Sequence, residues 1–329
     1  MKKHSIGSVT SFTIAVLCLL AVIISTVLAD SGTIPLSVKG TAPLTDITTK
    51  PLATLQCKYY NEKDFMSSVI AARQNQFTAK QNKTATKQNI VEVTIKSSSV
   101  AGGIVPHHLL AGKMIAEFFQ ALSIDNPEIV VVIAPNHRRI GVSGLHTSIQ
   151  SWATAFGVLE ADSELTGKLI KTLNASQNTA LMEEEHSISS LVPYIKYYLP
   201  QAKIVPVLLH GNYTAKESQK LGDLLSETLS DNPRAAIIAS VDFSHYLDVD
   251  TADKMDEITL AAIKSGDIPS ISIMGNDNLD SPPSIMTLLS AMEEMGTSVP
   301  EVLSHGNSSD ITGSGADYTT SYYTMIFKR

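Results

Sequence analysis

Residues 235–248, AAIIASVDFSHYLD, carry an apolar run directly into a polar corner. The run AAIIASV is apolar or small at consecutive positions, which is typical of a strand covered on both faces. Four similar runs lie at 100–106, 128–135, 203–209 and 322–327. Helical stretches are predicted between them, at 109–122, 160–173, 188–198, 214–230, 252–264 and 284–295. The alternation predicts an α/β fold of three layers, with a mostly parallel central sheet and helices on both faces.

The region before these elements is more polar. Residues 62–75, EKDFMSSVIAARQN, predict a first helix, and the polar stretch 76–89 predicts a loop. Residues 30–56 carry Pro, Gly, Ser and Thr without periodicity, so we expect a flexible tether there. One α/β domain is expected over residues 57–329.

The N-terminus has the pattern of an export segment. Lys2 and Lys3 precede an almost unbroken apolar run from Phe12 to Ala29. This pattern is typical either of a signal peptide cleaved after Ala29 or of an uncleaved membrane anchor formed by a transmembrane helix. Both alternatives predict a domain outside the cytoplasm. The protein would be membrane-anchored in one case and secreted or periplasmic in the other.

Composition limits the classes of partner. The chain of 329 residues has a formal net charge of −7, and this acidity argues against a nucleic-acid partner. Cys18 lies in the apolar N-terminal run, so Cys57 stands alone in the predicted domain. An intramolecular disulfide within that domain is therefore excluded.

Histidines stand where the predicted strands end or polar turns begin. The carboxyl ends of neighbouring parallel strands share one crevice, so imidazoles far apart in the sequence can converge there. Neutral imidazoles supported by carboxylates are what a metal site requires. The candidates for such a shared site are His107, His137, His186 and His245. Ordinary turn or capping roles are expected for His146, His210 and His305.

Other polar residues accompany these histidines. Glu185 and Asp242 are candidates for orienting the imidazoles. Neighbouring side chains of an extended segment point to opposite sides, so only one of His107 and His108 can be a metal ligand. The residues expected to support the ligands or to line a substrate pocket are His108, Asn136, Glu185, Asp242 and Tyr246.

Ser244 raises the alternative of a serine hydrolase. Ser244 and His245 are adjacent, so their side chains point apart and do not form a nucleophile–base pair. The chain has no G-x-S-x-G motif. A hydrolase in which His186 or His137 serves Ser244 across the crevice is therefore the weaker alternative.

Seven stretches, taken in order, resemble motifs of the Memo-like family, known in prokaryotes as AmmeMemoRadiSam system protein B. GGIVPHHLLAG resembles the family's P-H-A-G motif, with His108 and Leu109 in place of Ala and Gly. VVVIAPNHRR resembles G-P-S-H, and EEEHSISSLVPY resembles E-H-S-[IL]-E followed by L-P-[FY]. SVDFSHYLD resembles S-S-D-[LF]-[SC]-H-[YW]. The others are KYYNEKDFMSSVI, SWATAFGVLEAD and NSSDITG.

The resemblance implies the fold of class III extradiol ring-cleaving dioxygenases, which bind non-haem Fe(II) through two histidines and one carboxylate. His107 and His137 match the two histidine ligands, and Ser244 falls at the third-ligand position. His186 matches the acid/base histidine, and His245 belongs to the shared S-H-[YW] pattern. In DSPPSIMTLL, Asp280-Ser281 stand where the family usually has Cys-Gly.

Two functions remain in competition at this point. The first is an oxygenase- or oxidoreductase-like enzyme with a divalent metal, Fe(II) first and copper second, acting on a small molecule with dioxygen. In it, His186 and His245 are the candidate catalytic histidines, and Tyr246 donates to a bound anion. The second is a non-catalytic metal- or ligand-binding module exposed outside the cytoplasm, which a neutral Ser244 at the third-ligand position favours.

Overall fold

Four parallel strands form the centre of the fold in the computed structural model, which describes residues 53–85, 99–230, 232–315 and 317–329. In spatial order they are β2 (Val100–Val105), β9 (Ala235–Ser240), β3 (Ile129–Pro135) and β8 (Lys203–Leu209). Each is buried along nearly its whole length, as a strand covered on both faces must be. The predicted α/β fold with a mostly parallel sheet is thus confirmed at its centre.

Both edges of this sheet contain antiparallel pairs. Next to β2 lies β12 (Thr319–Lys328), which is antiparallel to it and contains the fifth predicted run. The strands β10 (His245–Leu247) and β11 (Glu301–Asn307) pair with β12, also antiparallel. At the other edge β4 (Leu145–Thr147) is antiparallel to β8, and β7 (Ser176–Gln177) is parallel to β4.

The double glycine of β2 allows close contact between neighbouring groups. A Cβ atom on Gly103 would lie 2.4 Å from the carbonyl oxygen of Met325 and 2.5 Å from the ring of Phe118. Only glycine leaves room for this approach. β2 is therefore held between β12 and the helix that carries Phe118.

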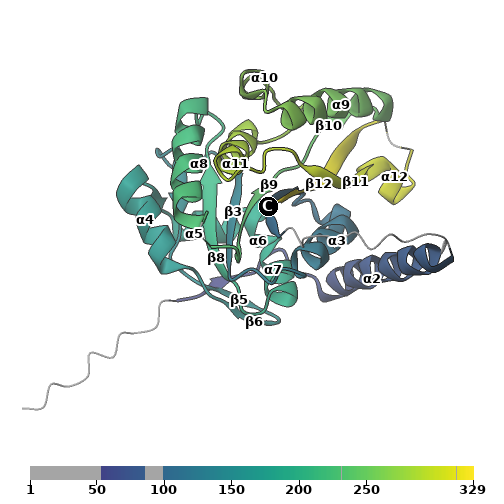
Figure 1. The fold of residues 1–329 in the computed structure, drawn as a ribbon, viewed down its shortest axis with the longest axis horizontal. Coiled ribbons are helices and arrows are strands. Elements are labelled where there is room, and N and C mark those ends of the chain that lie inside the picture. Colours follow the sequence, from purple (N-terminus) through teal and green to yellow (C-terminus); the bar gives the residue numbers. More distant parts are fainter. Residues whose placement is uncertain (1–52, 86–98, 231, 316) are drawn as a thin grey trace, which may run out of the picture. The chain divides into compact units, whose positions relative to one another are not determined.

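Helices cover both faces of the sheet (Figure 1). One face packs against α4 (Ser163–Leu173), α8 (Ala215–Leu229), α9 (Val249–Ser265), α10 (Ile268–Ser272) and α11 (Pro282–Glu294). The other packs against α2 (Glu62–Ala85), α3 (Gly112–Leu122), α5 (Thr179–Glu184), α6 (His186–Ser189) and α7 (Val192–Tyr198). A 3-10 turn, η1 (Leu109–Ala111), precedes α3, and α12 (Ser308–Thr312) connects β11 to β12. The three predicted layers are present.

Two predictions for the region before the sheet are wrong in part. α2 continues to Ala85, so residues 76–85 are helical and not a loop, because Lys, Gln and Ala are good helix formers. Near the end of the predicted tether, β1 (Leu55–Gln56) pairs with β5 (Trp152–Thr154), and β6 (Gly157–Leu159) completes this small sheet. The rest of the predicted tether, up to residue 52, lies outside the described residues.

The structure contradicts the expectation of a membrane-spanning helix. Among the described residues, no helix combines the length and the apolar character needed to cross a bilayer. The inference of a signal peptide or anchor, and of a place outside the cytoplasm, is withdrawn with it. The run Phe12–Ala29 on which that inference rested lies outside the described residues.

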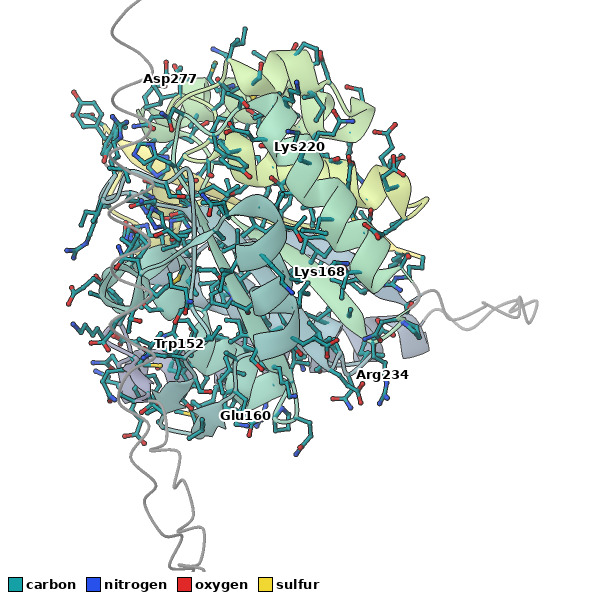
Figure 2. All side chains as sticks on the ribbon, turned by 90° about the vertical axis from the view of Figure 1, so that its left-hand side faces the viewer. Trp152, Glu160, Lys168, Lys220, Arg234 and Asp277 are labelled. Carbon is teal, nitrogen blue, oxygen red and sulfur yellow. The ribbon has the colours of Figure 1, made fainter. Side chains whose placement is uncertain are left out.

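The two ends of the central strands face opposite ends of the domain. In Figure 2, Arg234, which directly precedes β9, and Glu160 lie at the lower end, whereas Asp277 lies at the upper end. Asp277 belongs to the loop between α10 and α11, which also carries Asp280. The carboxyl ends of the parallel strands point toward this upper end, which is where ligands bind in open α/β sheets.

Candidate metal centre

Residues following three parallel strands meet at the upper end of the sheet. His107 lies two residues beyond β2, His137 two residues beyond β3 and Asp242 two residues beyond β9. The start of α6 adds His186, and the loop before α11 adds Asp280. Parallel pairing of β2, β9 and β3 explains why residues more than a hundred positions apart are neighbours here.

Of the four histidines predicted to share one site, the structure groups three, which are His107, His137 and His186. The ring centroids of His107 and His137 lie 5.1 Å apart, those of His107 and His186 5.2 Å, and those of His137 and His186 4.5 Å. One ring nitrogen from each lies within 4.8 Å of those of the other two. The spacing is that of side chains able to share one ion.

Two aspartates border the same space. Oδ2 of Asp280 lies 3.2 Å from Nε2 of His107 and 3.3 Å from Nε2 of His137. Oδ2 of Asp242 lies 3.5 Å from Nε2 of His107. The donor atoms of His107, Asp242 and Asp280 form a second group within 4.8 Å of one another.

The Nδ1 atoms of His107 and His137 each have a hydrogen-bond acceptor, which fixes the tautomer of the neutral ring. The Ser240 hydroxyl donates to the carbonyl of Ser187 at 2.6 Å, so its oxygen accepts from Nδ1–H of His107 at 3.1 Å. Nδ1–H of His137 donates to Oε1 of Glu185 at 2.9 Å. Both Nε2 atoms are therefore left facing Asp280, the arrangement of a metal-binding histidine supported from behind.

The nearby carboxylates favour a positive charge on or between the imidazoles. Burial opposes protonation of His137, but hydrogen bonds with Asp280 and Glu185 outweigh it and raise the pKa to about 10. For His107, burial is likewise outweighed by Asp242 and Asp280, so its pKa is raised. Although burial opposes the change, the histidines lower the pKa of Asp280. In addition, Oδ1 of this buried carboxylate has no hydrogen-bond partner within the described residues. A divalent cation fits this donor set.

Backbone hydrogen bonds hold the surrounding carboxylates in place. Oε2 of the fully buried Glu185 accepts from the His137 backbone N–H at 3.0 Å, and Oε1 lies 3.2 Å from Nδ1 of His186. Oδ1 of Asp242 accepts from the backbone N–H groups of His107 at 3.1 Å and His108 at 3.4 Å. Glu185 and Asp242 are thus in direct contact with the histidines that they were predicted to support.

The prediction of Ser244 as third ligand is contradicted by its contacts. Its hydroxyl donates to Oδ1 of Asp256 at 2.7 Å, and Ser321 donates to the same oxygen at 2.7 Å. Nε2 of His305 lies 2.7 Å from Oδ2 of Asp256. Ser244 is fully buried in this network, which also removes it as an exposed nucleophile of a hydrolase.

Asp280 is a candidate ligand that the sequence reasoning missed. The signal was present, because Asp280 stands where the resemblance placed a cysteine, a residue type that binds metals. The match of Ser244 to a third-ligand position pointed to a different residue. Spatially, only Asp280 brings one carboxylate oxygen to both imidazoles among the described residues.

The remaining candidate residues do not belong to the grouped donors. Asn136 is buried and binds the backbone of Ile140 through its side chain, which shapes the loop that begins at His137. His245 lies in β10, and its backbone N–H donates to the carbonyl of Asn276 at 2.8 Å. Tyr246 is 69 % exposed, with a left-handed φ of 63° that is strained for an aromatic residue.

A cavity of about 530 Å³ is lined by two residues that contact His107 or His186, although neither histidine lines it. Tyr59 lines it, and the Tyr59 ring centroid lies 5.9 Å from that of His186. Ser190, also in its wall, donates to the carbonyl of His107 at 3.1 Å. Its volume is that of a small-molecule site.

Comparisons with known proteins define the class. The family model described as Memo-like protein matches residues 71–326, so the chain belongs to the Memo-like family. It is 30% identical over 236 residues to the MEMO1 family protein PAE0818 of Pyrobaculum aerophilum, covering 69% of this chain and 83% of that protein. It is 29% identical to a MEMO1 family protein of Aquifex aeolicus, covering 68% and 84%.

A solved structure is also similar. The uncharacterized protein JW3007 from Escherichia coli K12 matches with a TM-score of 0.47 and 12% sequence identity, covering 68% of this chain and 99% of that one.

Proposed function

We propose that the protein binds one divalent metal ion through His107, His137 and Asp280, and that the ion serves an oxygenase- or oxidoreductase-like reaction on a small molecule. The observation that carries the proposal is the approach of both Nε2 atoms to a single oxygen of Asp280, at 3.2 and 3.3 Å. The tautomers fixed by Ser240 and Glu185 support it, since each leaves an Nε2 lone pair available for a metal.

The donor types favour Fe(II). Two imidazoles and one carboxylate, with further positions open, form the ligand set of non-haem Fe(II) oxygenases. Copper is the second candidate, because imidazole suits it as well, but the described part of the site offers no thiolate to favour Cu(I). Asp242, 3.5 Å from Nε2 of His107, adds negative charge that stabilises a divalent ion.

The bound ion would supply Lewis-acid chemistry and, if it is iron, redox chemistry to a substrate or dioxygen at its open positions. His186 would move protons beside it. Nδ1 of His186 lies 3.2 Å from Oε1 of Glu185, which leaves Nε2 to exchange a proton with the substrate. Glu185 then positions His137 and His186 together. The cavity lined by Tyr59 is where we place the body of the substrate.

The alternative is a metal-binding module without turnover. The module hypothesis was favoured by a neutral Ser244 as third ligand. It loses that argument if the charged Asp280, which lies close to both imidazoles, is the third ligand instead. The two functions differ in one measurable property, the consumption of oxygen by the metal-loaded protein.

The test begins with protein purified without chelators and loaded anaerobically with Fe(II). We expect one iron per chain by mass spectrometry, and oxygen uptake at an electrode with some member of a panel of small phenols and catechols. His107→Ala, His137→Ala and Asp280→Asn should lose the iron while their circular dichroism spectra stay unchanged. His210→Ala, a histidine outside the cluster, is the matched control and should retain it. Bound iron without oxygen uptake would support the module, and a parent protein that binds no metal would contradict both functions.

A further inference from the structure

A second histidine beside the cluster has a partner of its own. Nδ1 of His108 lies 2.7 Å from the hydroxyl oxygen of Tyr322 in β12, and the two ring centroids are 5.8 Å apart. The two residues are 214 positions apart in the chain. Asp242, His107 and His186 are close enough to His108 to affect its charge.

The direction of this hydrogen bond follows from the surroundings of Tyr322. Its side chain is fully buried, and burial raises the pKa of the phenol, so the hydroxyl keeps its proton. A buried hydroxyl must donate to an acceptor. His108 Nδ1, at 2.7 Å, is the acceptor found at short distance.

A donating Tyr322 determines the tautomer of His108. If Nδ1 accepts a hydrogen bond, the neutral ring carries its proton on Nε2. The side chain of His108 is exposed, and its Nε2 has no hydrogen-bond partner within the described residues. An N–H donor of fixed orientation is therefore presented within range of the charges of His107, His186 and Asp242.

We propose that His108 is a substrate-binding residue whose Nε2–H donates to an anionic or carbonyl oxygen of the small molecule held at the metal, and that Tyr322 is the positioning residue that fixes this donor. The inference rests on the proposed function. The inferred role of His108 implies a substrate that binds the metal through one oxygen and carries a second, acceptor oxygen close to the first. The Memo-like P-H-A-G motif has Ala at this position, so the donor distinguishes the substrate of this chain from those of relatives that follow the motif.

The binding test uses acetohydroxamate, a small oxygen chelator, as the probe. The probe is titrated by calorimetry into protein loaded with Zn(II), which avoids redox reactions. His108→Ala should weaken binding by roughly tenfold through loss of a hydrogen bond to a charged oxygen. His108→Gln, whose amide also donates, should recover most of the affinity. Tyr322→Phe should give an intermediate Kd, with unchanged Zn(II) content in all three variants.

A second readout does not need the metal. In ¹⁵N spectra of the metal-free protein with labelled histidine, the signal absent from His108→Ala identifies His108. We expect the Nε2–H tautomer in the parent and a mixture of tautomers in Tyr322→Phe.

The outcomes separate the two proposals. An Nδ1–H tautomer of His108 in the parent, or an equal Kd for parent and His108→Ala with Zn(II) bound, overturns the role of His108 and leaves the metal site standing. Failure of the parent to bind Zn(II) or Fe(II) overturns the metal site and the substrate role together.

Discussion

A single carboxylate, that of Asp280, contacts both imidazoles of the proposed ligand set. Ser244 does not complete a ligand set with the imidazoles, because it is bound to Asp256, and within the described residues the contacts of Asp242 reach only His107 of the two imidazoles. With Asp280, the site has two imidazoles and a charged oxygen within 3.3 Å of both Nε2 atoms. Sequence reasoning proposed both histidines and did not propose this residue, since contacts between a loop and two strand ends leave no periodic signal.

Replacement of Asp280 tests its role as a ligand. Asp280→Asn keeps the shape but removes the charge, so Fe(II) affinity is expected to fall by at least about tenfold. Asp280→Cys keeps an anionic donor and is expected to shift preference toward softer ions such as Cu(I) or Zn(II). Competition titrations with a chromophoric chelator measure both effects. Equal Fe(II) affinity in the parent and Asp280→Asn would show that Asp280 is not a ligand.

The protonation of His137 predicts a pH dependence of metal binding. Asp280 and Glu185 outweigh burial and raise its pKa to about 10, well above the ordinary value of 6.5, so the metal-free ring is protonated at pH 7. A metal must displace that proton, and apparent affinity should therefore rise with pH between 7 and 10, by at most about tenfold per pH unit for one proton. Calorimetry in two buffers of different ionisation enthalpy should detect proton release at pH 7. Identical heats in the two buffers would contradict the expectation.

The elements around the site are tied together by Asp256 of α9. Its buried carboxylate accepts hydrogen bonds from Ser244 next to β10 and from Ser321 in β12, and it lies against His305 of β11. α9 itself starts at a capping residue, Asp248, whose carboxylate accepts from the backbone N–H of Thr251. This network holds the antiparallel edge of the sheet against the helix and does not contact the proposed metal.

Ser244→Ala separates structure from metal binding. Removing the hydroxyl leaves Oδ1 of Asp256 with one hydrogen bond fewer in a buried place, so the free energy of unfolding should fall by about 1–3 kcal/mol. Metal content should stay at the parental value. Urea unfolding and metal analysis of the same preparation give the two numbers. Loss of the metal without loss of stability would restore Ser244 as a ligand candidate.

Long elements were predictable from the sequence, and short ones were not. All five apolar runs became strands, because four to eight consecutive apolar residues carry a clear signal. Strands of two or three residues, such as β4 and β7, are too short to show a period. The helix predicted at 188–198 is divided between α6 and α7, and Pro193 lies in the first turn of the second, where proline is favoured.

In the described domain as a whole, topology brings the site together. Parallel pairing of β2, β9 and β3 aligns their carboxyl ends, and α6 and the loop before α11 complete the cluster from opposite faces of the sheet. The convergence of His107, His137 and His186 could be anticipated because the strand ends of a parallel sheet share one edge. Whether a loop such as the one before α11 contributes a further ligand depends on how it packs, and this cannot be predicted from the hydrophobic pattern of the sequence.

The most direct test of the account is anomalous X-ray diffraction at the iron edge from crystals of the Fe(II)-loaded protein. We predict one strong peak within coordination distance, roughly 2.0–2.3 Å, of Nε2 of His107, Nε2 of His137 and a carboxylate oxygen of Asp280. No peak at this position, or a peak bound by other residues while these three side chains keep their direct contacts, would contradict it.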